Sequence, residues 1–309
     1  MSQTHALTPK ESRPESRTRT GTSAYADEAS TLSPSTAASL GRQAQTPVEP
    51  GFLPLSSVQT AGPSDLLGNI ADDAVDWLND RYGDWPAEAV IDKAVHGLFK
   101  GGIAAVSSFG AESAVLLALI ARVTSDLPLI FLDTGQHFPE TLAYRDQLIG
   151  HLGLTGLRVI QPDPVQLAHA DNDGTLWSRA PDYCCHLRKV LPLERALEGF
   201  SAWIGGRKRH HGDSREDVRV FEALDGRIQI NPLAHWSAEE INRTFRELEL
   251  PRHPLVADGF LSIGCAPCTK PAGACAGPRS GRWAGSGKTE CGIYNRREGS
   301  AARLKPVQP

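Results

Sequence analysis

The sequence contains no uninterrupted apolar run that approaches the roughly 18 residues from which a membrane-spanning helix is predicted. It also lacks a basic excess: its formal net charge is −4 at pH 7, which argues against a general nucleic-acid-binding protein. Charged residues make up 22% and apolar residues 40% of the 309 positions, as in soluble globular proteins. We therefore expect a soluble protein with no membrane or nucleic-acid partner, long enough to bury a complete core.

No apolar signal segment opens the chain, and a protein of this length does not need disulfide bonds to fold. Its six cysteines are therefore best explained as reduced thiols of a cytoplasmic protein. Such thiols are available for metal binding, cluster binding or redox chemistry.

The first sixty residues differ in composition from the rest. Ser, Thr, Pro and Ala occupy 32 of these 60 positions, Ile and Trp are absent, and five basic residues balance five acidic ones. Such a segment cannot bury enough apolar surface to offset the entropy that it would lose on ordering. We predict that residues 1–62 form a disordered extension. A transit peptide is the alternative, which the five acids and the missing amphipathic face disfavour.

From residue 63 onward, apolar patterns alternate between the periods of helices and strands. Helical spacing covers residues 65–78 and 87–98. Further along, strands are expected at 103–106, 129–132, 157–160 and 202–204, and helices at 111–122, 139–152 and 183–197. Strands that alternate with helices of this length predict βαβ units, and therefore an α/β fold with a mostly parallel sheet flanked by helices.

The last third of the chain changes character. Residues 221–230 are expected to form a hairpin around Asp225-Gly226, a common turn pair. Ser237 and Glu240 have the spacing of a capping box, which predicts the start of a helix. After Pro251 the sequence is rich in Gly and Pro and has little periodicity, so we expect loops and a tail.

Two loops at expected strand ends are candidates for ligand binding, because ligands of open parallel sheets bind beyond the carboxyl ends of the strands. Residues 107–113 carry a glycine and several hydroxyls and open a helix, whose N-terminal N–H groups can hold phosphate oxygens. This loop is neither a Walker loop nor the Rossmann glycine fingerprint. Asp133 can hold a ribose hydroxyl or a metal. An ordinary turn and helix cap is the commoner explanation of the first loop, and a capping Asp explains Asp133 equally well.

Four cysteines form two close pairs. Cys184 and Cys185 are adjacent, and Cys265 and Cys268 form a C-x-x-C motif. Four thiolates suit a tetrahedral sulfur site, either zinc or a [4Fe–4S] cluster. Because zinc ligands are normally two to four residues apart, the adjacent pair favours iron–sulfur, while zinc stays open. A thioredoxin-type motif would lie at a helix start after an early strand, whereas this one lies in a late Gly/Pro loop.

The two remaining cysteines are candidate nucleophiles. Cys291 lies in a polar, Gly-rich tail, and cationic Lys288 stands three residues before it. Cys275 lies in an Ala/Gly/Pro loop with no charge nearby before Arg279. We therefore favour Cys291.

Basic residues gather in two places. Residues 205–211 include Gly206 and Arg207 and follow an expected strand, and Arg279 and Arg282 precede Cys291. Arginine binds phosphate or sulfate through two hydrogen bonds, which indicates an anion site. Solvated charge runs are the alternative.

Together these motifs resemble a known family. The segments that carry the resemblance are 107–113, 132–135 with 138–141, 184–193, 206–209, 265–268 and 290–293. They closely resemble the assimilatory adenylyl-sulfate reductases of the phosphoadenylyl-sulfate reductase family. The resemblance runs from about residue 65 to residue 295 and leaves the N-terminal segment outside.

The resemblance implies an adenine nucleotide α-hydrolase-like, Rossmann-like fold in which 107–113 is a modified pyrophosphatase-type loop. It implies a nucleotide-binding reductase domain at 63–264, followed at 265–309 by a cluster-binding loop and a mobile tail. One [4Fe–4S] cluster per subunit is expected on Cys184, Cys185, Cys265 and Cys268. The residues expected to bind substrate are Ser107, Ser108, Phe109, Gly110, Ser113, Asp133, Lys189, Gly206, Arg207, Arg279 and Arg282.

The resemblance also implies the reaction. The thiolate of Cys291 would attack the sulfur of adenosine 5′-phosphosulfate, AMP would leave, and an S-sulfocysteine would remain on the enzyme. Thioredoxin, or a glutaredoxin-like reductant, would then release sulfite for cysteine biosynthesis in the cytoplasm. A mobile tail suits this chemistry, because Cys291 must face first a closed site and then a protein thiol.

Two alternatives and two departures stay open. The substrate can instead be the 3′-phosphorylated nucleotide, although reductases with that preference generally lack the two cysteine pairs. The chain can also be a zinc-stabilised nucleotide-binding module without redox activity. The family usually has His where this sequence has Tyr294, and Cys275 has no counterpart in its pattern. Whether the protein is a homo-oligomer is also left open.

Overall fold

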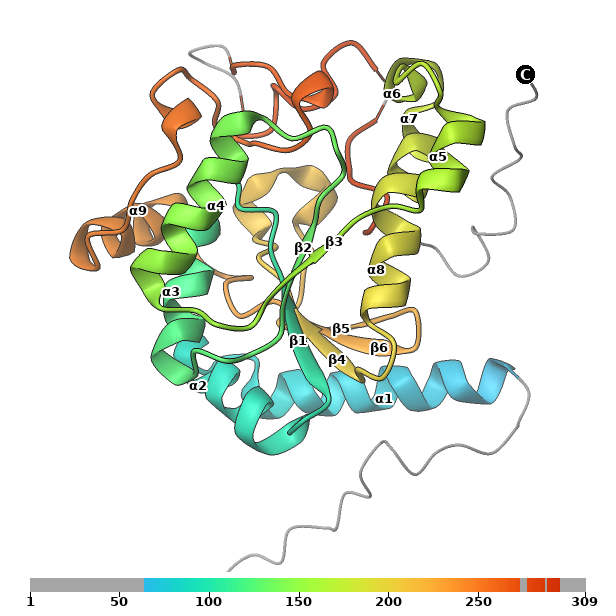
Figure 1. The fold of residues 1–309 in the computed structure, drawn as a ribbon. Helices are drawn as coiled ribbons and strands as arrows, with labels where there is room; N and C mark the ends of the chain where they lie inside the picture. The colour runs from blue at the N-terminus through green and yellow to red at the C-terminus, as the bar shows by residue number, and fades with distance from the viewer. Residues whose placement is uncertain (1–63, 273–276, 287, 295–309) are drawn as a thin grey trace, which may run out of the picture. The chain divides into compact units, whose positions relative to one another are not determined.

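The computed structural model describes residues 64–272, 277–286 and 288–294, which form an α/β structure around one sheet (Figure 1). The sheet has six strands in the order β3-β2-β1-β4-β6-β5. The strands are β1 (Ile103–Val106), β2 (Leu129–Leu132), β3 (Leu157–Ile160), β4 (Ala202–Ile204), β5 (Phe221–Leu224) and β6 (Arg227–Ile230). All neighbours are parallel except β5 and β6, which form the expected hairpin. The predicted fold class is confirmed.

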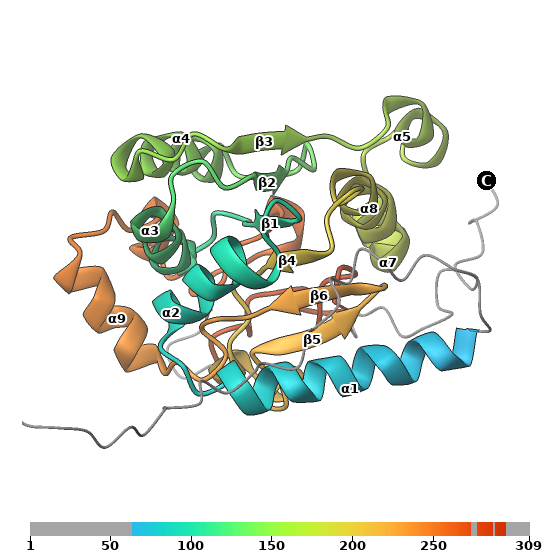
Figure 2. The same ribbon diagram turned by 90° about the horizontal axis from the view of Figure 1, so that it is seen from below.

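Helices cover both faces of this sheet. They are α1 (Ser64–Tyr82), α2 (Ala87–Asp92), α3 (Ser113–Val123), α4 (Pro139–Leu152), α5 (Pro164–Ala170), α6 (Leu176–Arg179), α7 (Pro181–Cys185), α8 (Leu191–Ala196) and α9 (Ala238–Glu247). Figure 2 shows α2, α3 and α4 on one face, α8 on the other, and α1 along the β5 edge. No helix in the described part of the chain has the length and apolarity needed to span a bilayer.

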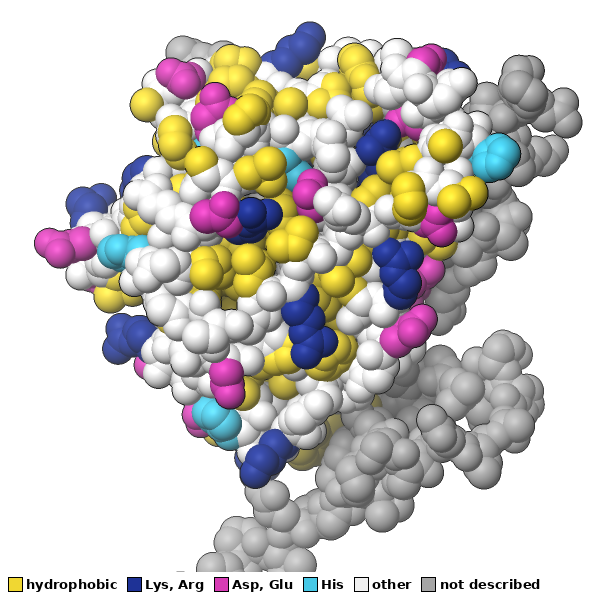
Figure 3. All heavy atoms as spheres, in the orientation of Figure 1, with side chains coloured by type: hydrophobic (Ala, Val, Ile, Leu, Met, Phe, Trp, Pro, Cys, Tyr) yellow, Lys and Arg dark blue, Asp and Glu magenta, His cyan; other side chains and the backbone are white. Residues whose placement is uncertain are grey.

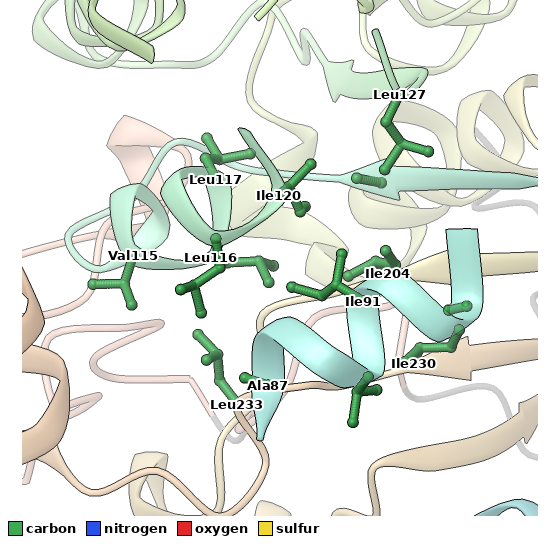
Figure 4. Packing of buried hydrophobic residues seen from close by; sticks show 14 of the residues in the cluster. Ala87, Ile91, Val115, Leu116, Leu117, Ile120, Leu127, Ile204, Ile230 and Leu233 are labelled. Carbon is green, nitrogen blue, oxygen red and sulfur yellow. The ribbon is translucent and has the colours of Figure 1, made fainter. Parts of the chain in front are cut away.

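The main core lies between the sheet and the α2–α3 layer. All side chains of β2 are buried, as expected for a strand covered on both faces. Helix α3 turns Leu117 and Ile120 into the same core, where Ile91 of α2 and Ile204 of β4 also lie (Figure 4). Burying one such side chain contributes about 1.5–3 kcal/mol, so this layer fixes the strand ends that carry the site.

The helix predicted at 183–197 is interrupted. Helix α7 passes into a π-helical turn, His186–Val190, before α8 begins at Leu191. Pro192 has no backbone N–H to donate to the carbonyl four residues earlier, so it disfavours regular α-helical bonding at this point. The turn carries Arg188 and Lys189.

The capping box of α9 is present: the Ser237 hydroxyl accepts from the Glu240 N–H, and the Glu240 carboxylate accepts from the Ser237 N–H. Beyond α9 the chain has short 3-10 turns and loops, as predicted. Residues 1–62 and Cys275, on which other predictions were made, lie outside the described residues.

Candidate active site

A cavity of about 180 Å³ opens at the carboxyl ends of β1, β2 and β4. Its wall contains polar residues, aromatic residues and two glycines. They are Ser107, Ser108, Gly110, Glu112, Ser113, His137, Lys189, Gly206, Arg207, Lys208, His211, Arg215, Ser262, Arg279, Arg282, Trp283, Glu290, Cys291 and Tyr294. On the face of Figure 3, basic and acidic side chains are interspersed. The cavity wall, by contrast, carries six Lys or Arg side chains and only two acidic ones, Glu112 and Glu290.

The cavity gathers most of the residues that the sequence singled out. They are Ser107, Ser108, Gly110, Ser113, Lys189, Gly206, Arg207, Arg279, Arg282 and Cys291. Phe109 and Asp133 do not line it. The Phe109 ring is buried and packs edge-on against Phe131, with ring centroids 5.5 Å apart. The Asp133 carboxylate accepts a 3.0 Å hydrogen bond from the Gly135 N–H. Their part in substrate binding stays a prediction.

The loop after β1 owes its shape to two backbone features. Phe109 has φ +49°, in the left-handed region, and its N–H donates to the Ser107 hydroxyl oxygen at 3.2 Å. This conformation turns the Phe109 ring inward. A Cβ at Gly110 would lie 3.0 Å from the carbonyl oxygen of Ile263, so this position favours glycine. The amino end of α3 consequently borders the cavity, where the helix dipole favours an anion.

Glu112 connects several basic groups on this wall. Its carboxylate lies 3.0 Å from the Lys208 Nζ, 2.8 Å from the His211 Nε2 and 3.7 Å from the His210 Nε2. Burial opposes ionisation, but the histidine hydrogen bonds and the Lys208 charge hold the pKa of Glu112 well below its usual range. Glu112, His210 and His211 are close enough to share a metal ion. The Lys208 ammonium on the same carboxylate argues against a cation there.

Glu290 pairs two other cavity arginines. Its oxygens accept from the Arg215 Nε at 2.7 Å and Nη2 at 3.0 Å, and from the Arg279 Nη2 at 3.0 Å. The Cys291 N–H also donates to it, at 2.8 Å. Burial alone would raise the pKa of Glu290, but hydrogen bonds and charge from Arg215, with the charge of Arg279, lower it to about 2. The carboxylate is thus ionised and saturated with donors.

Lys189 and Arg282 differ from these paired cations. Among the described residues, neither forms an ion pair with a carboxylate. The Arg282 guanidinium lies 4.4 Å from the centre of the Trp283 ring and fills space that a Cβ at Gly264 would invade. Burial would lower the pKa of Lys189, but the neighbouring thiols raise it overall, so the side chain stays cationic. These two groups are available to bind an anion.

Cys291 is half-buried beside both of these cations and beside Cys185. A hydrogen bond with Cys185 lowers the pKa of the Cys291 thiol; burial opposes this, and Lys189, the Ile293 N–H and Arg282 lower it further. The same contact raises the pKa of Cys185. The charges of Lys189 and Arg282 favour the thiolate of Cys291 whether or not Cys185 carries a proton, and a thiolate is what a nucleophile needs.

The four cysteines of the two pairs line a second, smaller cavity next to the first. The Cys265 sulfur lies 3.4 Å from the Thr134 hydroxyl oxygen, and burial raises the pKa of Cys184 to about 11. Arg188 fixes the surrounding backbone, because it donates to the Thr134 carbonyl oxygen at 2.7 Å and to Asp171 at 2.6 Å. The four thiols offer the donor set of a metal or a cluster.

Sequence reasoning did not assign a role to several cavity residues. Arg215 and Glu290 form a buried pair across 75 positions, which no local pattern indicates. Lys208 and His211 were visible in the basic run, but their acidic partner was not. His137 also lines the cavity, and its Nε2 bonds to the Leu132 carbonyl oxygen at 2.9 Å. Its position just after a strand end was the available signal.

The cavity, the thiols and the sheet can be compared with known proteins. Residues 102–271 match the family model described as the phosphoadenosine phosphosulfate reductase domain. The adenosine 5′-phosphosulfate reductase of Chelativorans sp. strain BNC1 is 52% identical over 218 residues, which cover 70% of this chain and 89% of that protein. The phosphoadenosine 5′-phosphosulfate reductase of Gloeobacter violaceus is 39% identical over 219 residues, 69% of this chain and 90% of that protein.

A solved structure extends the likeness to the fold. The crystal structure of phosphoadenylyl-sulfate reductase from Candida auris, a phosphate complex, has a TM-score of 0.55 and 26% sequence identity. The match covers 64% of this chain and 97% of the Candida auris chain. The chain therefore belongs to the phosphoadenosine phosphosulfate reductase family.

Proposed function

We propose that this protein is an assimilatory adenylyl-sulfate reductase, which reduces adenosine 5′-phosphosulfate to sulfite and AMP. The observation that carries this proposal is the position of Cys291, whose thiol shares one cavity with Lys189, Arg282 and the loop after β1. Family membership and 52% identity to a protein named as such a reductase support it. The reaction is an oxidoreduction at sulfur, in the pathway of sulfate assimilation.

The chemistry follows from the charges. A thiolate and a phosphosulfate repel each other, so cations must neutralise both before they can meet. Lys189 and Arg282, which lack carboxylate partners among the described residues, suit the anionic groups nearest Cys291. The Cys291 thiolate attacks the sulfur, the sulfur–oxygen bond to the phosphate breaks, and AMP leaves with the electron pair. The product on the enzyme is an S-sulfocysteine.

Release of sulfite needs two electrons from a dithiol, for which we propose cytoplasmic thioredoxin. One thiolate of the reductant attacks the Cys291 sulfur, sulfite leaves with the bonding pair, and the second thiol resolves the mixed disulfide. The reductant is oxidised to its disulfide while sulfur(VI) becomes sulfur(IV). The Gly-rich segment that carries Cys291 suits this exchange, because such a segment can present the thiol outward.

We also propose that Cys184, Cys185, Cys265 and Cys268 hold one [4Fe–4S] cluster. All four line one cavity and offer a set of four thiols. Zinc ligands are normally two to four residues apart, so the adjacent Cys184 and Cys185 favour the cluster over zinc. When bound, the cluster would tie α7 to the 265–268 loop and place its thiolate ligands beside Lys189.

The test is sulfite release by anaerobically purified protein with thioredoxin, using adenosine 5′-phosphosulfate and its 3′-phosphorylated form in parallel. We expect turnover of the unphosphorylated nucleotide, and none with Cys291→Ser. Faster turnover of the 3′-phosphorylated nucleotide would reverse the proposed substrate. No sulfite from either, in a colourless protein with one zinc per chain, would replace the enzyme with a zinc-stabilised binding module. About four irons per chain, with visible absorption near 400 nm, would support the cluster.

A further inference from the structure

The turn that carries Cys291 is held on both sides of the thiol. Glu290 precedes Cys291, and Tyr294 closes the turn by donating its N–H to the Cys291 carbonyl oxygen at 3.0 Å. Between them, Ile293 is buried against Leu193 and Trp203. Arg215 lies near both flanking side chains, but their other contacts differ: Glu290 pairs with Arg279, and Tyr294 packs on Trp203 and Arg207.

Glu290 is the polar anchor. The bonds that it receives from Arg215 and Arg279 are charge-assisted and buried, and both arginines line the cavity. Because the Cys291 N–H donates to the same carboxylate, the backbone of the nucleophile is fixed relative to these arginines. Loss of the carboxylate would free that N–H and leave two buried cations without their anion.

Tyr294 is the aromatic anchor. Its ring stacks on Trp203, with centroids 6.0 Å apart and planes 20° apart. The Arg207 guanidinium lies 4.9 Å from the centre of the Tyr294 ring, and the Arg215 guanidinium lies 5.7 Å from the same centre. Arg207 is itself held by Glu222 at 2.7 Å, so the ring contacts both an indole and a cation that has its own carboxylate partner. A neutral phenol ring suits this position, since a protonated imidazole would meet two guanidinium groups there.

We propose that Glu290 and Tyr294 are positioning residues for Cys291, which hold the 290–294 turn so that the thiol faces the bound nucleotide. This inference rests on the proposed function. Tyr294 acts through stacking rather than through charge, which gives a physical role to the residue that stands where the family usually has His. Cys291 is half-buried with both anchors in place, so loss of either anchor is expected to expose its thiol further.

The first measurement is alkylation of Cys291 by iodoacetamide in the free holoenzyme. Trypsin cuts after Lys288 and Arg296, so peptide 289–296 reports Cys291 alone, whereas Cys275 lies in peptide 253–279. Tyr294→Ala and Glu290→Gln should each raise the alkylation rate roughly tenfold, the factor expected for one lost contact of this type. Tyr294→Phe, which keeps the ring, should react at the parent rate, as should Trp85→Ala, a partly exposed aromatic control outside the cavity wall.

The second measurement is the single-turnover rate of adduct formation at saturating nucleotide. Tyr294→Ala should lower this rate about tenfold, while the nucleotide Kd changes less than threefold and the iron content stays the same. Tyr294→Phe should restore the rate. Tyr294→Leu should behave like Tyr294→Ala, and it replaces that variant if Tyr294→Ala does not fold.

Three outcomes would overturn the inference. They are parent-like alkylation of Tyr294→Ala or Tyr294→Leu, parent-like adduct formation by the same variant, or a defect in Tyr294→Phe as large as that in Tyr294→Ala. Failure of the proposed function looks different, because the parent protein itself would then form no adduct. The alkylation rates would still report whether the two anchors hold the turn.

Discussion

The body of the sheet and the segment after residue 250 are stabilised in different ways. In the body, α3 alone buries seven consecutive side chains, from Ala114 to Ile120. The described residues after 250 bury few large apolar side chains, but they place Glu290 and Trp283 against cations of the cavity. Apolar burial is non-directional and cooperative, whereas ion pairs and thiol sites depend on pH, salt and metal. The part that carries Cys291 can therefore loosen without unfolding the sheet.

The largest expected effect comes from the four-cysteine site, which joins the two regions. Cys268→Ser should remove the iron and the activity together, because one ligand of the cluster is lost. Proteolysis should then cut the segment after residue 250 first, while the sheet core keeps its protection against hydrogen exchange. Cys275→Ser is the matched control and should keep its iron. Full iron content in Cys268→Ser would contradict the assignment.

Acid should weaken the junction between the two regions. His253 is buried; its Nε2 lies 3.0 Å from the Thr141 hydroxyl, and its Nδ1 accepts from the Leu255 N–H. Burial lowers the pKa of His253 to about 4, below its ordinary value near 6.5. As the pH falls, His253 is therefore protonated in the unfolded chain before it is protonated in the folded protein. Its contribution to the free energy of unfolding is complete above pH 6.5 and decreases as the pH drops toward 4, by up to about 3 kcal/mol.

Urea unfolding between pH 7.5 and pH 4 measures this effect. His253→Gln should reduce the slope between pH 6.5 and 4, leaving the part that comes from His211, whose pKa burial also lowers to about 4. His151→Asn, at an exposed histidine of α4, should keep the parent slope. A slope that is the same in His253→Gln as in the parent would assign the acid sensitivity to other groups.

Lys189 and Arg282, unlike the cavity cations that pair with carboxylates, are expected to contact the nucleotide, so their removal should have a smaller effect, on nucleotide binding. Lys189→Ala or Arg282→Ala should each weaken nucleotide binding by roughly 1.5–3 kcal/mol, which is about ten- to hundredfold in Kd. Melting temperature and iron content should hardly change. Arg243→Ala is the control, because Arg243 is exposed on α9 and pairs only with exposed Glu247. Parent-like binding by both cavity variants would mean that these cations do not contact the nucleotide.

The smallest effect on stability is expected from an ion pair at the edge of the segment after residue 250. Lys288 pairs with Asp182 of α7; the side chain of Lys288 is 4% exposed and that of Asp182 is 63% exposed. Because the Asp182 carboxylate is solvated and screened, Asp182→Asn should cost at most about 1 kcal/mol and shift the denaturation midpoint only slightly. A loss above about 2 kcal/mol would show that this pair, rather than Glu290, is the main polar contact of the tail.

Sequence patterns predicted the secondary structure of the sheet and its helices better than the arrangement of the segment after residue 250. The central strands were found because apolar runs of about four residues between turn residues are too short for buried helices. Helices α5 and α6 were missed because they are too short to show an apolar period, although Asp163 caps α5. The interruption at Pro192 was missed because periodicity alone does not distinguish a π-helical turn from the helix around it.

The site was predictable only where its residues are neighbours in sequence. The cysteine pairs and the basic run at 205–211 are local, so their chemistry could be read directly. The pairing of Arg215 with Glu290 depends on how the tail packs, which no local pattern encodes. Phe109 was expected among the binding residues, but the left-handed backbone at that position turns its ring into the core.

The central claim is that Cys291 is the nucleophile toward the phosphosulfate sulfur. Its most direct test is to mix anaerobic protein with adenosine 5′-phosphosulfate, without reductant, and to weigh the tryptic peptides. Peptide 289–296 should gain about 80 Da, the mass of one SO₃ group, and the gain should disappear in Cys291→Ser. A gain located on Cys275 in peptide 253–279, or no gain on any peptide, would contradict the claim.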